Sequence, residues 1–317
     1  MEKNIYLLNG GLSCNNILKS LNNLSSIKKN KKKLDILKAY QLNTNSLSNN
    51  GIYELLLIKK NKEISEIFDK DTVIFTSIND IESGLILGSN FKVNKIFPIL
   101  NISDNKNLKS LRDIKDFKNH FAKNNNITKY WDMNIDQKKI NIDLINLKND
   151  IPKISWEYFD SKYLSDYKRY SFSKFVKFFR EIMNTGLEYK NIIFVSDNKF
   201  IVDFLKKIKN KDELFDKNKD TIEYSSLFKI NIKLDKNLEV KSFKKIYPTK
   251  YNFSPLKANN NNKFIYSFNN KSYYLTNSLN LLNIDILKKY NLNRCFDKKI
   301  IELLLENLKK NNNNKIN

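Results

Sequence analysis

The chain has few of the residues that build covalent, metal-binding or sharply turning structures: its 317 residues include 2 cysteines, 1 histidine, 4 prolines and 6 glycines. Cys14 and Cys295 are too few for a disulfide framework, so we expect a reducing, cytosol-like compartment, with Cys14 packing and not reacting. The histidine, His120, has no second metal ligand near it in the sequence. We therefore expect no metal site, and no motif implies a cofactor.

Long apolar runs are also missing. No uninterrupted apolar stretch approaches the roughly 18 residues that a membrane-spanning helix needs, so we expect no membrane partner. Residues 1–4 lead directly into a strand pattern, without the charged, apolar and small-residue regions of a signal peptide. The expected location is the cytoplasm.

Arginine is scarce although the formal net charge is +23. The excess of lysine, asparagine and isoleucine is typical of an AT-rich genome, such as that of a giant virus or a protist, and a viral protein would act in the host cytoplasm. We favour solvated lysines that reflect this coding bias. The alternative is a selected surface that binds polyanions such as nucleic acids, weakly and with an affinity that falls as salt rises.

Strand and helix patterns alternate through the first two thirds of the chain, which predicts a mostly parallel central sheet covered by helices, a three-layer α/β/α sandwich. The strand at residues 191–196 is apolar on both faces and should be central. Further strands are expected at 5–8, 72–77 and 95–100, an antiparallel edge hairpin at 228–243, and helices at 51–67, 169–182 and 199–208. The helix at 169–182 spaces Phe172, Phe175, Val176 and Phe179 for one core-facing side.

The first strand ends in an unusual turn, "NGGLSCNN", in which Asn9, Gly10, Gly11 and Leu12 carry no nucleophile, base or charge. Four further segments follow in order: "LSNNG" at 47–51, "VIFTSINDIESGLIL" with Ser77 at the end of its strand, "IFPILNIS", and "IIFVSDNKFIVDFL".

These five segments, spread over residues 5–247, resemble the histidine phosphatase superfamily, whose fold is phosphoglycerate mutase-like. In that family the first strand ends in Arg-His-Gly-Glu/Gln-Ser/Thr, with an asparagine three positions on, and Gly11, Ser13 and Asn16 keep this register. The resemblance implies a phosphohistidine mechanism that needs a nucleophilic histidine, two arginines that hold phosphate, and a second histidine after the late strand.

None of these four catalytic residues is present at its matching position. The nucleophile's position holds Gly10, the neighbouring arginine's holds Asn9, and the second histidine's holds Asp197, followed by Asn198. The second arginine falls near residue 79 or 81, and the first arginine of the chain is Arg112. The resemblance thus implies a catalytically inactive pseudophosphatase that acts as a binding or scaffold protein, for an unknown protein partner or a phosphorylated ligand.

Two features of the empty site stay open at this point. The backbone N–H groups of Gly10 and Gly11, with Ser13, could still hold an anion, although Ser13 is expected mainly to cap the following helix. The space left by the missing histidine and arginine is either a small polar pocket or partly collapsed, and we favour partial collapse, with a hydrogen bond between Asn9 and Asp197. An enzyme with a rebuilt site, using Asp197 and lysines on a phosphorylated substrate, is the main alternative function.

The expected domain organisation follows the resemblance. Residues 1–257 would form the histidine-phosphatase-like domain, and 258–262 a linker. Residues 263–308 would form a small hairpin-and-helix extension, whose last helix begins at Asp297, and 309–317 a disordered tail.

Overall fold

The computed structural model describes residues 2–13, 16, 47, 49–59, 61–68, 71–103, 150–159, 171–184, 189–208, 222, 224–234, 238–247, 257–258, 264–268 and 271–275. Its centre is a seven-stranded sheet with the strand order β4-β3-β2-β5-β1-β6-β7. The strands are β1 (Glu2–Asn9), β2 (Thr72–Ser77), β3 (Lys95–Ile99), β4 (Lys153–Ile154), β5 (Asn191–Ser196), β6 (Leu227–Leu234) and β7 (Leu238–Tyr247).

The sheet is mostly parallel, as the sequence predicts. Strands β1 to β5 run in one direction, while β6 and β7 are antiparallel and form the hairpin at one edge. Strand β5 lies in the middle, between β1 and β2, and all of its residues are buried. The predicted central position of this strand is confirmed.

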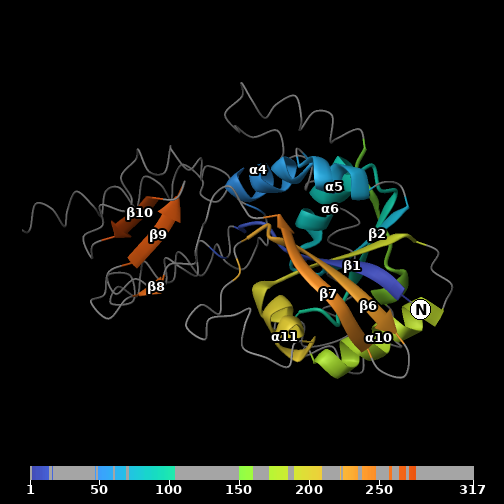
Figure 1. Cartoon of the computed structure of the whole chain (residues 1–317). Helices are drawn as coiled ribbons and strands as arrows, with labels where there is room; N and C mark the ends of the chain where they lie inside the picture. Colours follow the sequence, from blue (N-terminus) through green and yellow to red (C-terminus); the bar gives the residue numbers. More distant parts are fainter. Residues whose placement is uncertain are drawn as a thin grey trace, which may run out of the picture.

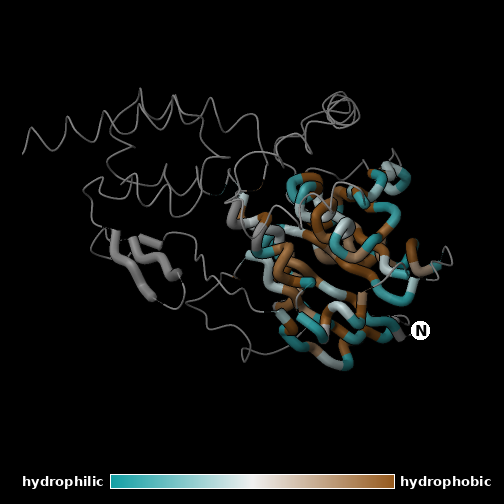
Figure 2. The backbone as a smooth tube through the Cα atoms, turned by 90° about the horizontal axis from the view of Figure 1, so that it is seen from above, coloured by the Kyte–Doolittle hydropathy of each residue, from teal (hydrophilic) through white to brown (hydrophobic). Residues whose placement is uncertain are grey.

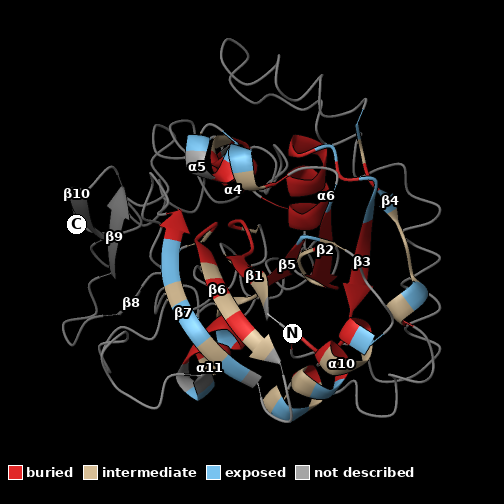
Figure 3. Cartoon of the chain, turned by 45° about the vertical axis from the view of Figure 1, so that its right-hand side comes forward, coloured by how far each residue is buried: buried red, intermediate tan, exposed pale blue. Residues whose placement is uncertain are grey.

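Helices cover both faces of the sheet, which confirms the three-layer α/β/α class (Figures 1 and 3). One face carries α4 (Asn49–Ile58), α5 (Lys62–Ile67) and α6 (Ile81–Asn90); the other carries α10 (Phe172–Asn184) and α11 (Asn198–Ile208), with the short η2 (Glu157–Phe159) near β3. Alternating residues of β5 pack against the helices on the two faces of the sheet. Ile193 packs with the first set of helices, and Phe194 packs with the second. Figure 2 shows the apolar stretches gathered in the interior of this layered region.

Helix α10 faces the core with aromatic side chains, as its spacing predicts. The Phe175 ring lies 5.1 Å from that of Phe194 and 5.2 Å from that of Phe200, both edge to face. Buried aromatic pairs of this kind contribute about 0.5–1.5 kcal/mol each beyond the burial of their area. These rings fix α10 and α11 against the central strand.

The helix predicted at 51–67 is in fact two helices. The chain leaves α4 after Ile58 and enters α5 after Asn61, whose backbone is extended (φ −80°, ψ 114°). Polar residues at 59 and 61–62 interrupt the apolar face between Ile58 and Ile64, both fully buried. A single continuous helix was therefore a wrong prediction, since its pattern was read across this polar gap.

A separate three-stranded antiparallel sheet contains β8 (Lys257–Ala258), β9 (Phe264–Phe268) and β10 (Lys271–Leu275). The hairpin of β9 and β10 matches the predicted one, and β8 spans the last residue of the expected first domain, Lys257, and the first residue of the expected linker, Ala258. His120, both cysteines, the helix expected after Asp297 and the tail lie outside the described residues. The division into domains stays a prediction.

No helix within the described ranges is long and apolar enough to cross a membrane.

Candidate functional site

The site lies at the carboxyl edge of the sheet, where the loops after β1, β2 and β5 meet. Asn9 ends β1 and pairs in register with Ser196, which ends β5. The chain then continues into Asp197 and helix α11, so the first loop and the late loop are neighbours. Open α/β sheets bind their ligands at this edge.

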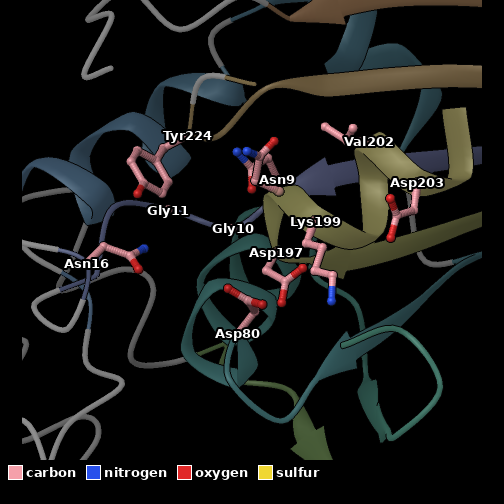
Figure 4. A pocket seen from close by; sticks show the side chains of 11 residues that line it. Asn9, Gly10, Gly11, Asn16, Asp80, Asp197, Lys199, Val202, Asp203 and Tyr224 are labelled. Carbon is pink, nitrogen blue, oxygen red and sulfur yellow. The ribbon is translucent and has the colours of Figure 1, made fainter. Parts of the chain in front are cut away.

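A pocket of about 480 Å³ opens here (Figure 4). Its lining residues come from the first loop, from the segment before α6, from α11 and from the segment before β6: Asn9, Gly10, Gly11, Asn16, Asp80, Asp197, Asn198, Lys199, Val202, Asp203 and Tyr224. Most of the positions that the sequence singled out thus share one pocket. Ser13 and Ser77 do not line it but support residues that do.

The space directly above Gly10 is filled by Asp80. An ideal Cβ built on Gly10 would lie 2.8 Å from the Asp80 Cγ and closer still to a carboxyl oxygen, and 3.4 Å from the Ser83 Oγ. Asp80 immediately precedes α6 but makes no side-chain capping bond; its Oδ2 instead accepts a 2.6 Å hydrogen bond from the Ser77 Oγ. The carboxyl group therefore stands beside position 10, where the resemblance expects a histidine.

The sequence did not single out Asp80. It lies between residues 79 and 81, the two positions that could match the family's second arginine. Neither match places a functional residue at position 80. A signal was present, because an aspartate after a buried strand and before a helix is placed at the functional edge of such a sheet. The space at Gly10 is thus filled by a side chain that the sequence analysis did not name, and a pocket remains beside it.

The two glycine N–H groups are already used within the protein. Gly10 N donates to the Ser196 carbonyl oxygen at 2.9 Å, and Gly11 N donates to the Ser83 Oγ at 3.1 Å. An anion at Gly10 would also meet the Asp80 carboxyl group. These internal hydrogen bonds make an anion at the two glycines less favourable, and the residual anion site expected at Gly10, Gly11 and Ser13 stays a prediction. The Ser13 Oγ accepts from the Asn16 N–H at 3.1 Å, as in a helix N-cap.

Side-chain amides hold the opposite wall of the pocket. The Asn9 Nδ2 donates to the Ile222 carbonyl oxygen at 3.0 Å, and the Asn198 Oδ1 accepts from the Ile222 N–H at 2.9 Å. Asp197 caps α11, because its Oδ1 accepts from the Phe200 N–H at 3.0 Å. Asn9 and Asp197 share the pocket, and a hydrogen bond between them stays a prediction.

Buried carboxyl groups dominate the electrostatics. Burial raises the pKa of Asp80 to about 7; the hydrogen bond from Ser77 lowers this pKa, and the charge of Asp197 raises it further. Burial also raises the pKa of Glu54, a residue of α4 that is 2% exposed and accepts from the Ser225 Oγ at 3.3 Å. The pKa of Tyr224 is raised by burial and by the charges of Asp80 and Glu54. This environment disfavours phosphate.

The segment "LSNNG" supports the first loop by close packing. A Cβ at Gly51 would lie 2.8 Å from the Leu12 backbone nitrogen, so only glycine lets α4 approach this closely. Leu47 forms a β-bridge with Ser13, and its N–H donates to the buried Glu82 carboxylate at 2.6 Å. The glycine that matches the family pattern therefore has a packing role.

Among the described residues that line the pocket, the side chains offer carboxyl groups, amides, one ammonium group and one phenol. Lys199 is exposed, and it lies one helical turn from Asp203 on α11. Across the described ranges, no group of three or more His, Cys, Asp or Glu side chains is arranged to hold a metal ion.

Comparison with known proteins gives remote structural similarity alone. No protein-family model matches the chain, and no curated protein sequence matches it. Among solved structures, "Mycobacterial hydrolase 1" is similar with a TM-score of 0.40 at 8% identity, covering 78% of this chain and 100% of that one. The ecdysone phosphate phosphatase from Bombix mori, solved with tungstate, is similar with a TM-score of 0.41 at 14% identity, covering 76% and 92%. The residues of the site must therefore carry any statement about function.

Proposed function

We propose that this chain is a degenerate member of the histidine phosphatase superfamily, a pseudophosphatase that acts as a binding or scaffold protein. The family's ordered sequence segments support membership. The mostly parallel sheet supports it too, because it brings the end of β1 and the start of α11 to one pocket. These are the two segments that carry the catalytic histidines in the family.

The observation that carries the proposal is the Asp80 carboxyl group against Gly10. Phosphoryl transfer to the protein needs a nucleophile with a lone pair at this point and fixed cations around the phosphoryl oxygens. The pocket instead offers a glycine, a carboxyl group above it and a second carboxyl group at Asp197. Removing one hydrogen-bond donor to the negative charge of a transition state typically raises the activation free energy by about 2.7–4 kcal/mol. In this pocket, carboxyl groups, which accept hydrogen bonds, stand where the family has cationic donors.

The test is a phosphatase assay on the purified full chain with an aryl phosphate and a sugar phosphate. We expect turnover no higher than that of a buffer blank and no acid-labile phosphoenzyme after incubation with either substrate. Turnover that survives repurification and disappears in Asp197→Ala would overturn the pseudophosphatase proposal, as would a phosphohistidine at His120.

A second candidate function is an enzyme with a rebuilt site. It is favoured by Asp80, a carboxyl group with a pKa of about 7 at a ligand pocket, because a proton donor or acceptor is most effective when its pKa is near the working pH. Such an enzyme would show a rate that changes with pH around 7. Asp80→Asn would abolish the rate, whereas Glu66→Gln, which alters an exposed carboxylate of α5, would not.

A further inference from the structure

The pocket is large enough for a small organic ligand. Its volume of about 480 Å³ lies within the range of about 300–1,000 Å³ that is common for ligand pockets. Val202 and the ring of Tyr224 give the pocket apolar surface, and the amides of Asn9, Asn16 and Asn198 give it hydrogen-bonding groups. A single metal ion would leave most of this volume unused.

The charge of the pocket is opposite to that of the protein. The chain carries a formal charge of +23, yet the described residues that line the pocket include three carboxyl groups, Asp80, Asp197 and Asp203, and one cation, Lys199. The charge of Asp197 disfavours the ionised form of Asp80, and both side chains line the pocket. A positive group between them would remove this repulsion, whereas an anion would add to it.

Tyr224 supplies a second and independent indication of a ligand. Its hydroxyl has no hydrogen-bond partner within the described part of the chain, and Figure 4 shows the hydroxyl end directed into the pocket, toward the side where Asn16 lies. Its raised pKa keeps the phenol protonated and neutral at physiological pH. A hydroxyl without a partner in a partly buried place is less stable than one that hydrogen-bonds, so a ligand N–H would be stabilised there.

We propose that the pocket binds a small organic cation, with an ammonium or amidinium group between the carboxyl groups of Asp80 and Asp197 and an apolar part against Tyr224 and Val202. This inference rests on the proposed loss of phosphate chemistry and names the ligand class of the same site. A cation must approach against the net positive charge of the protein, so its binding cannot be attributed to attraction by the surface as a whole.

The binding should depend on pH through Asp80. The groups that act on this carboxyl are Asp197 at the start of α11, the Ser77 hydroxyl, and Tyr224, on which Glu54 also acts. Lys199 and Asp203 lie on the same pocket wall of α11. A bound cation favours ionised Asp80, so binding releases a proton, and the affinity should rise as the pH rises through about 7.

The experiment compares three probes of one shape: benzamidine, a cation; benzamide, which is neutral; and benzoate, an anion. Each is titrated into the full chain by calorimetry at pH 8 and at pH 5.5, in buffer with enough salt to suppress surface binding. We expect benzamidine to bind about tenfold or more tightly than benzamide, as the loss of a charge-assisted hydrogen bond implies. Benzoate should not bind in the pocket.

Two variants and one control assign the site. Asp80→Asn and Asp197→Asn should each weaken benzamidine binding about tenfold or more, because each removes one carboxylate partner. Asparagine still offers an oxygen to the Ser77 hydroxyl in the first variant and to the Phe200 N–H in the second, and thermal unfolding checks that both fold. Glu66→Gln should leave the affinity unchanged.

Equal binding of benzamide and benzamidine, no binding of benzamidine at pH 8, or unchanged affinity in both aspartate variants would each overturn the inference. So would saturable binding of Mg²⁺ or Ca²⁺ that both variants abolish, since the site would then be one for metal ions. The phosphatase assay is a separate measurement. Failure to bind benzamidine by an inactive protein defeats this inference alone, whereas phosphatase turnover defeats the proposed function.

Discussion

The carboxyl group of Asp80 occupies the space that a side chain at position 10 would need, and the Ser77 hydroxyl holds it there. No positive φ accompanies Gly10, so the constraint at this glycine is one of space and not of backbone conformation. The two residues are therefore energetically coupled, and this coupling can be measured.

Gly10→Ala should destabilise the protein by about 1–3 kcal/mol, because the new methyl group overlaps the Asp80 carboxyl group. Asp80→Ala in the same chain should recover most of this loss, since it clears the space. Chemical unfolding of the wild type, both single variants and the double variant gives the coupling energy. Additive effects of the two changes would show that the carboxyl group is not where the structure has it.

Grafting the family residues Asn9→Arg and Gly10→His together should not create phosphatase activity. The histidine ring would meet Asp80, and the second arginine and second histidine would still be missing. The graft should also lower the unfolding temperature, and adding Asp80→Ala should raise it again without restoring turnover. Measured hydrolysis of an aryl phosphate by the double graft would falsify the loss of the whole pocket.

The stability of the protein should carry a pH dependence that belongs to Asp80. Its pKa is raised from 3.8 to about 7 in the folded state, so the folded protein binds the proton more tightly than the unfolded chain. The contribution of this group is therefore most favourable below about pH 4 and is lost as the pH rises toward 7. Asp80→Asn should be nearly neutral at pH 4 and stabilising at pH 8, by ~1 kcal/mol or more.

Unfolding curves of the wild type and of Asp80→Asn at pH 4, 6 and 8 measure this difference, with Glu66→Gln as the control for an exposed carboxylate. A gap between wild type and Asp80→Asn that stays constant across this range would contradict the raised pKa.

Ile193→Asp should prevent stable folding. Ile193 is fully buried on β5, where its backbone pairs with Tyr6 on one side and Ile74 on the other, so an aspartate there would be an unpaired charge in the core. Lys190→Asp, three residues earlier and exposed, serves as the control. Circular dichroism and gel filtration should find the control folded and the core variant unfolded; a cooperatively folding Ile193→Asp would refute the doubly covered sheet.

Gly51→Ala should be more damaging than Gly10→Ala, and no single side-chain change should rescue it. The atoms that a Cβ at Gly51 would meet belong to the backbone of Leu12, whereas those at Gly10 belong to a removable side chain. We expect a loss of about 2–4 kcal/mol, measured by chemical unfolding. A loss smaller than that of Gly10→Ala would mean that α4 can move away from the first loop.

The sequence predicts the layers of the fold better than it predicts the site. Strand β5 was predictable because burial on both faces requires a continuous apolar run. Helix α10 was predictable because burial on one face requires apolar residues at helical spacing. The break at Asn61 was missed because the helical pattern was read across the polar residues between Ile58 and Ile64. Local periodicity therefore reveals which residues are buried, but not whether the backbone between them stays helical.

The site was predictable where a motif marked it and missed where tertiary contacts built it. Asn9, Gly10, Asp197 and Asn198 were found by comparison with a family pattern, and all line the pocket. Tyr224 was not found, because no pattern links a tyrosine ahead of an edge strand to a loop more than 200 positions earlier. The internal acceptors of Gly10 N and Gly11 N were missed for a related reason, since they come from Ser196 and Ser83, which are distant in the sequence.

The packing of Gly10 against Asp80 also has an evolutionary consequence. Restoring a histidine at position 10 is harmful while Asp80 is present, and removing Asp80 first would leave a void above a glycine. Under the proposed function, each single change toward the family residues would lower the stability of the protein before any activity could be selected. The proposed loss of the catalytic residues would therefore be difficult to reverse one substitution at a time.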